Sequence, residues 1–186
     1  MNDPFATLGV EPRFGLDLRA VEQRHRELSR TLHPDRYAGS PAAERRLALG
    51  RAIEVNEAWR VLRDPIRRAE ALVALAGVAL REEAGPRADP AFLMEIMELR
   101  EELSEVARKK DQGRLAALAG QVRAREEKAL GALGALLDGG AGDGDDAKDA
   151  AKDVEKALPR LAELKYFRRF LDEVSAIEEE LTDALP

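Results

Sequence analysis

Cysteine is absent from the 186-residue chain, and only two histidines are present. The lack of cysteine excludes disulfide bonds, thiolate metal sites and a cysteine nucleophile. Aromatic residues make up only 4% of the chain, whereas charged residues make up 35%, and alanine, leucine, glutamate and arginine are abundant. This balance is typical of an all-α protein.

Long hydrophobic runs are also missing, and no stretch approaches the length of a membrane span. The first residues, MNDPFATLGV, have neither the basic segment nor the apolar segment of a secretion signal. We therefore expect a cytoplasmic protein that does not bind membranes.

The net charge of −6 is unevenly distributed. Residues 1–76 contain 13 arginines, no lysine and 11 acidic residues, so this part is slightly basic and the rest of the chain is acidic. The basic residues alternate with acidic ones and are not interspersed with aromatic residues, which argues against nucleic-acid binding. A basic set made only of arginines instead indicates one particular docking face for a protein partner.

Capping signals predict four helices before residue 77, over about 4–8, 17–32, 41–63 and 66–76. Asp3-Pro4 and Ser40-Pro41 are start signals, and Gly9 and Asp64-Pro65 are stop signals. Two of these helices have an apolar stripe at spacings of three and four, which predicts an inward face. The predicted inward residues are Leu18, Val21, His25, Leu28 and Leu32 in one helix and Ala48, Ala52, Val55, Trp59 and Leu62 in the other.

The loop from His33 to Gly39 is too short to allow anything but an antiparallel hairpin of the two long helices. A rigid hairpin would hold this loop exposed at one tip. Pro34 disfavours helix at His33 and fixes the direction of the chain as it leaves the helix. His33 and Asp35 are then expected to project from the tip, near Arg26, Arg30 and Arg36.

The second half of the chain is predicted to form a three-helix bundle. Its helices are expected over about 89–110, 113–137 and 147–184, with a kink or an interruption of the last one at Pro159. A Gly/Asp-rich loop is expected over 138–146. The predicted organisation is thus a domain over 1–76, a connector over 77–90 and a second domain over 91–186.

The first helix of this bundle has more apolar surface than one stripe requires. Phe92, Ile96, Leu99, Leu103 and Val106 form a complete core-facing set. Beside it lie apolar and charged residues, namely Leu93, Met94, Met97, Glu98, Arg100 and Glu101. Methionine-rich surface with a charged rim suits partner recognition, whereas a helix wedged between two neighbours needs a wide stripe for its own packing. The residues alone leave both interpretations open.

Residues 4–76 resemble the J-domain family closely, through PFATLGV, HRELSRTLHPDRY and VNEAWRVLRDPIRRAE. The resemblance implies a four-helix domain that docks onto a 70-kDa heat-shock chaperone and stimulates its ATPase. The implied contact residues are His33, Pro34, Asp35, Arg26, Arg30 and Arg36. Glu22 and Gln23 stand where other J-domains are often basic, which suggests a weaker charged face or one tuned to a dedicated partner.

FLMEIMELREELSEV and LAELKYFRRFLDEV resemble the C-terminal domain of the HscB/Jac-type J-domain co-chaperones of iron–sulfur cluster assembly. The resemblance implies a co-chaperone, not an enzyme, that has no cofactor of its own and delivers the cluster scaffold IscU to HscA or DnaK. The implied scaffold contacts are Leu93, Met94, Met97, Glu98, Arg100, Glu101 and Phe167. The tract DGGAGDGDDAKD departs from the family as a lengthened connection, and the cysteine cluster that binds zinc in some eukaryotic relatives is absent.

Two alternatives remain. A general J-domain co-chaperone for unfolded clients would need a broad apolar groove in place of a small patch. A metal-dependent hydrolase would use His33 and Asp35, but it would also need a pocket and further convergent groups. No glycine loop that could hold a phosphate is present, and GDGDD is too short a series of oxygen ligands for a calcium loop.

Overall fold

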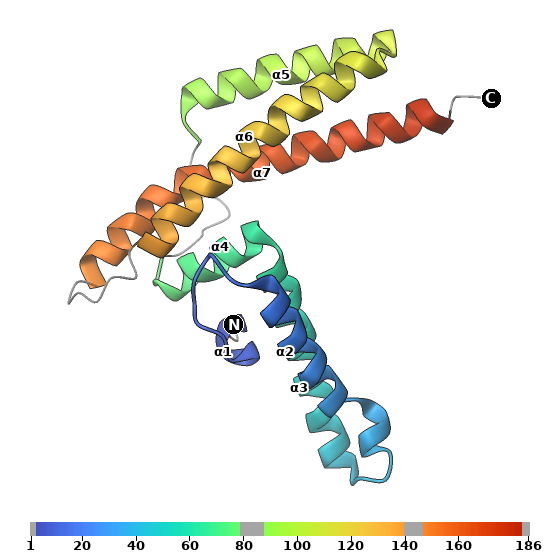
Figure 1. Ribbon diagram of the computed structural model, residues 1–186, viewed down its shortest axis with the longest axis vertical. Coiled ribbons are helices and arrows are strands. Elements are labelled where there is room, and N and C mark those ends of the chain that lie inside the picture. The colour runs from blue at the N-terminus through green and yellow to red at the C-terminus, as the bar shows by residue number, and fades with distance from the viewer. Residues whose placement is uncertain (1–2, 79–87, 140–146, 184–186) are drawn as a thin grey trace. The chain divides into compact units, whose positions relative to one another are not determined.

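The computed structural model describes residues 3–78, 88–139 and 147–183. Within these residues the regular elements are all helices, so the predicted all-α class is confirmed (Figure 1). The chain divides into two compact units, residues 1–79 and residues 80–186.

The N-terminal unit is built from four α-helices and one turn of 3-10 helix. In chain order these are α1 (Pro4–Leu8), α2 (Leu18–Thr31), η1 (Pro34–Tyr37), α3 (Ala42–Arg63) and α4 (Pro65–Leu75). Three aspartates cap these helices because their carboxylates accept backbone N–H groups that have no partner in the first turn. The capping residues are Asp3 for α1, Asp17 for α2 and Asp64 for α4. The predicted helices are therefore confirmed, with ends that shift by one or two residues.

The inward stripes of the hairpin helices are confirmed in part. Val21 is buried, but Leu18, in the first turn of α2, is 38% exposed and does not belong to the core as predicted. Ala58 is buried on α3, although the predicted stripe omits it. His25 of α2 faces α3, where it is packed and hydrogen-bonded. Its ring stacks on Trp59 at 5.6 Å between centroids, and its Nε2 lies 2.9 Å from the Asn56 side-chain oxygen.

The C-terminal unit is the predicted three-helix bundle, of α5 (Pro90–Lys109), α6 (Gln112–Gly139) and α7 (Ala147–Asp183). One detail of the prediction is wrong, because Asp138 and Gly139 belong to α6 and not to the Gly/Asp-rich loop. Of the two outcomes predicted at Pro159, the interruption does not occur, since α7 continues through this residue, and the kink stays a prediction. A proline removes one backbone N–H from a helix, and buried neighbours such as Leu161 on the same helix offset that loss through packing. Residues 79–87 of the predicted connector, residues 140–146 of the loop and residue 184 lie outside the described residues.

The core of the bundle is an apolar layer to which each of the three helices contributes. From α5 it takes Ile96, Leu99, Leu103 and Val106, from α6 Leu115, Leu118, Ala119, Val122, Ala129 and Leu133, and from α7 Leu161, Leu164, Phe167, Phe170 and Val174. Four of the five core residues predicted for α5 are thus buried, and the fifth, Phe92, is half-buried. The side of α5 opposite this layer faces solvent.

Candidate functional site

The tip of the hairpin, His33–Asp35, lies on the surface of the N-terminal unit. The side chains of His33 and Asp35 are 59% and 89% exposed. His33 caps η1, because its Nδ1 accepts the Asp35 backbone N–H at 3.4 Å, and the Asp35 carboxylate also lies 3.4 Å from Nδ1. Pro34 follows the cap in the first position of η1, where its missing N–H costs nothing. The predicted exposure of the tip is confirmed, and the turn is locally ordered.

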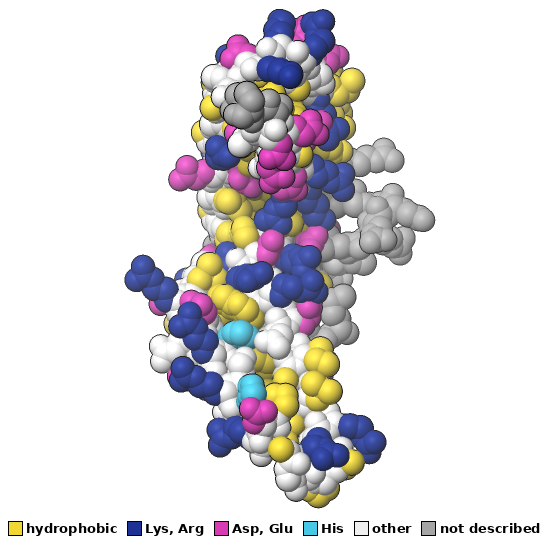
Figure 2. Space-filling view, turned by 90° about the vertical axis from the view of Figure 1, so that its right-hand side faces the viewer, with side chains coloured by type: hydrophobic (Ala, Val, Ile, Leu, Met, Phe, Trp, Pro, Cys, Tyr) yellow, Lys and Arg dark blue, Asp and Glu magenta, His cyan; other side chains and the backbone are white. Residues whose placement is uncertain are grey.

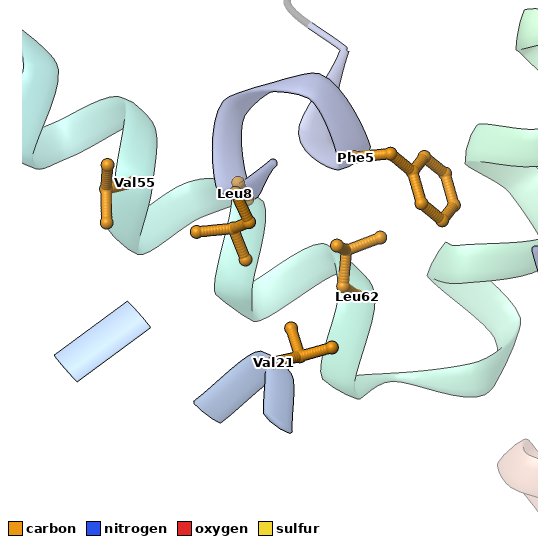
Figure 3. Close-up of a cluster of buried hydrophobic side chains, with 6 residues drawn as sticks. Phe5, Leu8, Val21, Val55 and Leu62 are labelled. Carbon is orange, nitrogen blue, oxygen red and sulfur yellow. The ribbon is translucent and has the colours of Figure 1, made fainter. Parts of the chain in front are cut away.

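A cluster of buried side chains from α1, α2 and α3 holds the hairpin that carries this tip (Figure 3). The cluster consists of Phe5, Leu8, Val21, Val55, Ala58 and Leu62. Close-packed interiors resist sliding of one helix along another, because every shift opens voids or creates overlaps. The tip is therefore displayed by a rigid support.

Arg68 fastens the segment between α1 and α2 to the end of the hairpin. It is 7% exposed, and its Nη1 donates a hydrogen bond of 2.8 Å to the Leu62 carbonyl. Its guanidinium group also lies 4.8 Å from the centre of the Phe14 ring, in a cation–π contact. The sequence gives no sign of this role, since nothing in it distinguishes a buried basic residue on a short helix from an exposed one.

A basic face runs along the exposed side of α2 towards the tip. Arg26 and Arg30 are exposed on it. Arg19 is also exposed there, two helical turns before Arg26, although it is not among the contact residues expected from the sequence. Figure 2 shows arginine side chains along one side of this unit, close to the two histidines. Arg26 is paired with Glu22 at 2.5 Å. In the described part of the chain, neither Arg30 nor Arg36 of η1 has an ion-pair partner.

The outer face of α5 carries two exposed methionines. Met94 is 66% exposed and Met97 is 62% exposed, and Leu93 beside them is half-buried. The opposite side of α5 is the one that packs into the core. The methionines are therefore not core residues, and we call Leu93, Met94 and Met97 the methionine patch.

Most of the glutamates of α5 are paired with a basic residue. The pairs are Glu95 with Arg125 at 2.7 Å, Glu102 with Arg114, and Glu105 with Lys109 at 3.1 Å. The hydrogen bond from Lys109 and its positive charge hold the pKa of Glu105 below its ordinary value. Glu98 and Glu101 have no ion-pair partner within the described residues, and both are exposed.

The unpaired carboxylates belong to the same surface as the methionine patch. Glu101 lies one helical turn after Met97, and Glu98 lies one turn after Met94. Arg100, at the edge of this surface, lies 3.6 Å from Glu173 of α7. The structure thus brings together every predicted scaffold-contact residue of α5.

Phe167 differs from the surface contact that the sequence predicts. It is 4% exposed, and its ring packs edge-on against Phe92. A direct contact with a partner would need an exposed side chain, so Phe167 supports α5 from within the bundle instead.

In the described part of the chain, the residues that a metal-dependent hydrolase would use do not form an assembled site. No group of three or more His, Cys, Asp and Glu side chains there is placed to hold a metal ion. His33 and Asp35 stand on open surface, not in a pocket. Every helix within residues 3–78, 88–139 and 147–183 is too short or too polar to cross a lipid bilayer.

Comparison with known proteins matches both units to described families. Residues 3–71 match the model of the DnaJ domain, and residues 88–175 match the model described as the HSCB C-terminal oligomerisation domain. A co-chaperone protein HscB homolog of Cupriavidus taiwanensis is 40% identical over 153 residues, which cover 82% of this chain and 86% of that protein. The chain belongs to the HscB co-chaperone family.

Solved HscB structures have the same fold. The chaperone HscB from Vibrio cholerae is similar with a TM-score of 0.80 and 31% identity, covering 97% of this chain and 99% of that one. Human co-chaperone HscB has a TM-score of 0.82 at 22% identity, over 96% of this chain and 83% of that one, and shows the shared fold. Membership of the HscB family confirms the resemblance found in the sequence and implies a co-chaperone of a 70-kDa heat-shock protein in iron–sulfur cluster assembly.

Proposed function

We propose that this HscB-family protein is an adaptor with two separate binding surfaces. The hairpin tip and the basic face of α2 dock onto a 70-kDa heat-shock chaperone, HscA or DnaK, and stimulate its ATPase. The methionine patch binds the cluster scaffold IscU and so delivers it to that chaperone. The cytoplasmic location expected from the sequence stays a prediction.

The geometry of the tip supports the first role. Exposed arginines on a rigid helix attract an acidic surface over several ångströms and orient it, an effect that salt weakens. His33 and Asp35 then supply short-range polar contacts that bias the conformational equilibrium of the chaperone. The chaperone performs the hydrolysis, and the adaptor contributes no catalytic residue.

The observation that carries the second role is the pairing pattern on α5. The unpaired carboxylates Glu98 and Glu101 stand beside the exposed Met94 and Met97, while the glutamates on the flanks of α5 are paired with neighbouring cations. Adaptable methionines with a charged rim suit a small, specific contact with one folded partner. A binder of unfolded clients would need a longer apolar groove.

Both surfaces belong to one chain, which gives the adaptor its effect. Binding of the scaffold to the bundle raises its effective concentration at the chaperone bound to the J-domain. No new contact between scaffold and chaperone is required for this gain.

The test is the ATPase rate of the chaperone with the adaptor, with the scaffold and with both. We expect the two together to stimulate more than the sum of their separate effects at scaffold concentrations where the scaffold alone does little. A reduced, unfolded model protein in place of the scaffold should not produce this excess. An equal excess with the unfolded protein would instead support a general co-chaperone.

A further inference from the structure

Met94 and Met97 carry all the sulfur of the described residues. The chain has three methionines and no cysteine, and the third methionine, Met1, lies outside the described residues. A cysteine thiolate reacts with peroxides faster than a methionine thioether does, so a reactive cysteine would divert an oxidant from the methionines. Because this chain has no cysteine, peroxide chemistry at sulfur falls on its methionines.

Both methionine side chains are open to solvent. Met94 is 66% exposed and Met97 is 62% exposed. They stand three residues apart on α5, so they are neighbours on one face of the helix. The unpaired carboxylates beside them, those of Glu98 and Glu101, do not repel hydrogen peroxide, because this oxidant carries no charge. A small neutral oxidant therefore reaches both side chains in the free protein.

The same two methionines provide the exposed apolar surface of the C-terminal unit. Within residues 88–139 and 154–183, they are the only large apolar side chains that are exposed, and Leu93 beside them is half-buried. A partner that makes an apolar contact with this unit thus depends on them. Oxidation converts each thioether to a polar sulfoxide, and covering the sulfoxide oxygen costs free energy unless a donor replaces its water.

We propose that the methionine patch is a reversible modification site at which a peroxide turns scaffold binding off. The inference rests on the proposed scaffold-binding function and adds its regulation. The lone pair of the sulfur attacks one oxygen of hydrogen peroxide, and the S–O bond forms as the O–O bond breaks. The sulfur is oxidised by two electrons, and the second peroxide oxygen takes the proton of the first and leaves as water. The described residues of the N-terminal unit contain no sulfur, so stimulation of the chaperone continues.

Reduction returns the patch to its binding form. Methionine sulfoxide reductases reverse the modification. Two thiols supply the two electrons and form a disulfide, while the sulfoxide oxygen leaves as water. An adaptor of iron–sulfur cluster assembly then withholds the scaffold under the conditions that also oxidise the iron and sulfide of a cluster.

The test treats the full-length chain with hydrogen peroxide, removes the peroxide with catalase and then titrates the scaffold by calorimetry. Removal of the oxidant before the titration keeps the scaffold itself reduced. Peptide mass spectrometry should find one added oxygen on Met94 and one on Met97. Affinity should fall by roughly tenfold or more, as the burial of unpaired polar groups predicts. Treatment with the two methionine sulfoxide reductases, one for each configuration at sulfur, should restore the original affinity.

Met94→Leu with Met97→Leu is the matched variant, because leucine has no sulfur to oxidise. Each protein is its own reference, since its affinity after peroxide is compared with its affinity before. We expect the two affinities of the leucine variant to agree within about twofold, because its patch cannot take up oxygen. Met1 is still present in this variant and controls for oxidation elsewhere. Stimulation of the chaperone ATPase by the oxidised wild-type chain alone should equal that by the reduced chain.

Unchanged affinity of the wild type after peroxide would overturn this inference, whether or not Met94 and Met97 carry the added oxygen. A loss that the reductases do not reverse, or an equal loss in the leucine variant, would overturn it as well, because the damage would then lie elsewhere. Loss of helix in the circular dichroism of the oxidised chain would replace a surface effect by unfolding. Failure of the proposed function looks different, since then the untreated wild-type chain does not bind the scaffold.

Discussion

Phe92 of α5 packs edge-on against Phe167 of α7, with ring centroids 5.4 Å apart and ring planes inclined by 81°. Tyr166 contacts Phe92 from the neighbouring position, at 5.9 Å and 69°. These contacts join the first turns of α5, which carry the methionine patch, to the longest helix of the bundle. The position of the patch therefore depends on an aromatic contact beneath it.

Replacement of Phe92 by alanine should loosen the start of α5. We expect a loss of about 2 kcal/mol in the free energy of unfolding, because the side chain is half-buried and its ring contacts disappear. Scaffold affinity should fall as well, since the patch loses its fixed position. Urea denaturation followed by circular dichroism measures the first effect, with Phe92→Leu as the control that keeps most of the volume. An unchanged midpoint for Phe92→Ala would show that α5 is held without this contact.

Arg68→Ala should destabilise the N-terminal unit by about 3 kcal/mol, since it removes a buried, charge-assisted hydrogen bond and a cation–π contact. The loss should appear in the fluorescence of Trp59, the only tryptophan of the chain, during denaturation. Phe14→Leu removes only the ring contact and should cost about 1 kcal/mol. If Arg68→Ala were as stable as the wild type, the guanidinium would not hold the segment between α1 and α2.

Asp35→Asn and His33→Gln should each abolish stimulation of the chaperone ATPase and leave the fold intact. Both side chains are mostly exposed, so their replacement should change the unfolding free energy by less than about 0.5 kcal/mol. The readout is the single-turnover ATPase rate of the chaperone. Glu44→Gln, an exposed carboxyl-to-amide change on α3, is the matched control and should behave as the wild type. Full stimulation by either tip variant would refute the role of the tip.

The double substitution Leu93→Ala with Met97→Ala should weaken scaffold binding by at least about tenfold, because central apolar side chains dominate small interfaces. Stimulation of the chaperone ATPase by the adaptor alone should stay at the wild-type level. Calorimetric titration measures the affinity, and Met97→Leu, which keeps volume and apolar character, should bind nearly as well as the wild type. Wild-type affinity in the double variant would remove the patch from the scaffold interface.

Most of the fold could be predicted because its signals are local. Asp3 and Asp17 cap helices in the structure at the predicted helix starts, and Asp64, predicted only to end one helix, also caps the next. The spacing of Ile96, Leu99, Leu103 and Val106 marks the buried side of α5 correctly. Pro34 fixes the direction in which the chain leaves α2, and the exposure of the hairpin tip could therefore be predicted.

Features that depend on neighbours far apart in the chain could not be predicted. Leu18 has the spacing of a core residue, but the described elements leave its side chain 38% exposed. Phe167 packs inside the bundle against Phe92, a residue of another helix that is 75 positions away in the chain. The pairing of Glu95 with Arg125, 30 positions away, likewise needs the packed helices, and it is this pairing pattern that singles out Glu98 and Glu101.

The most direct test of the adaptor is complementation between two defective chains. One chain carries Asp35→Asn and keeps the methionine patch, and the other carries Leu93→Ala with Met97→Ala and keeps the tip. Mixed at equal concentration with chaperone and scaffold, they should fail to restore the scaffold-dependent excess in ATPase rate that the wild-type chain gives, because delivery requires both surfaces on one molecule. Full restoration by the mixture would contradict the account, since the two surfaces would then act independently of each other.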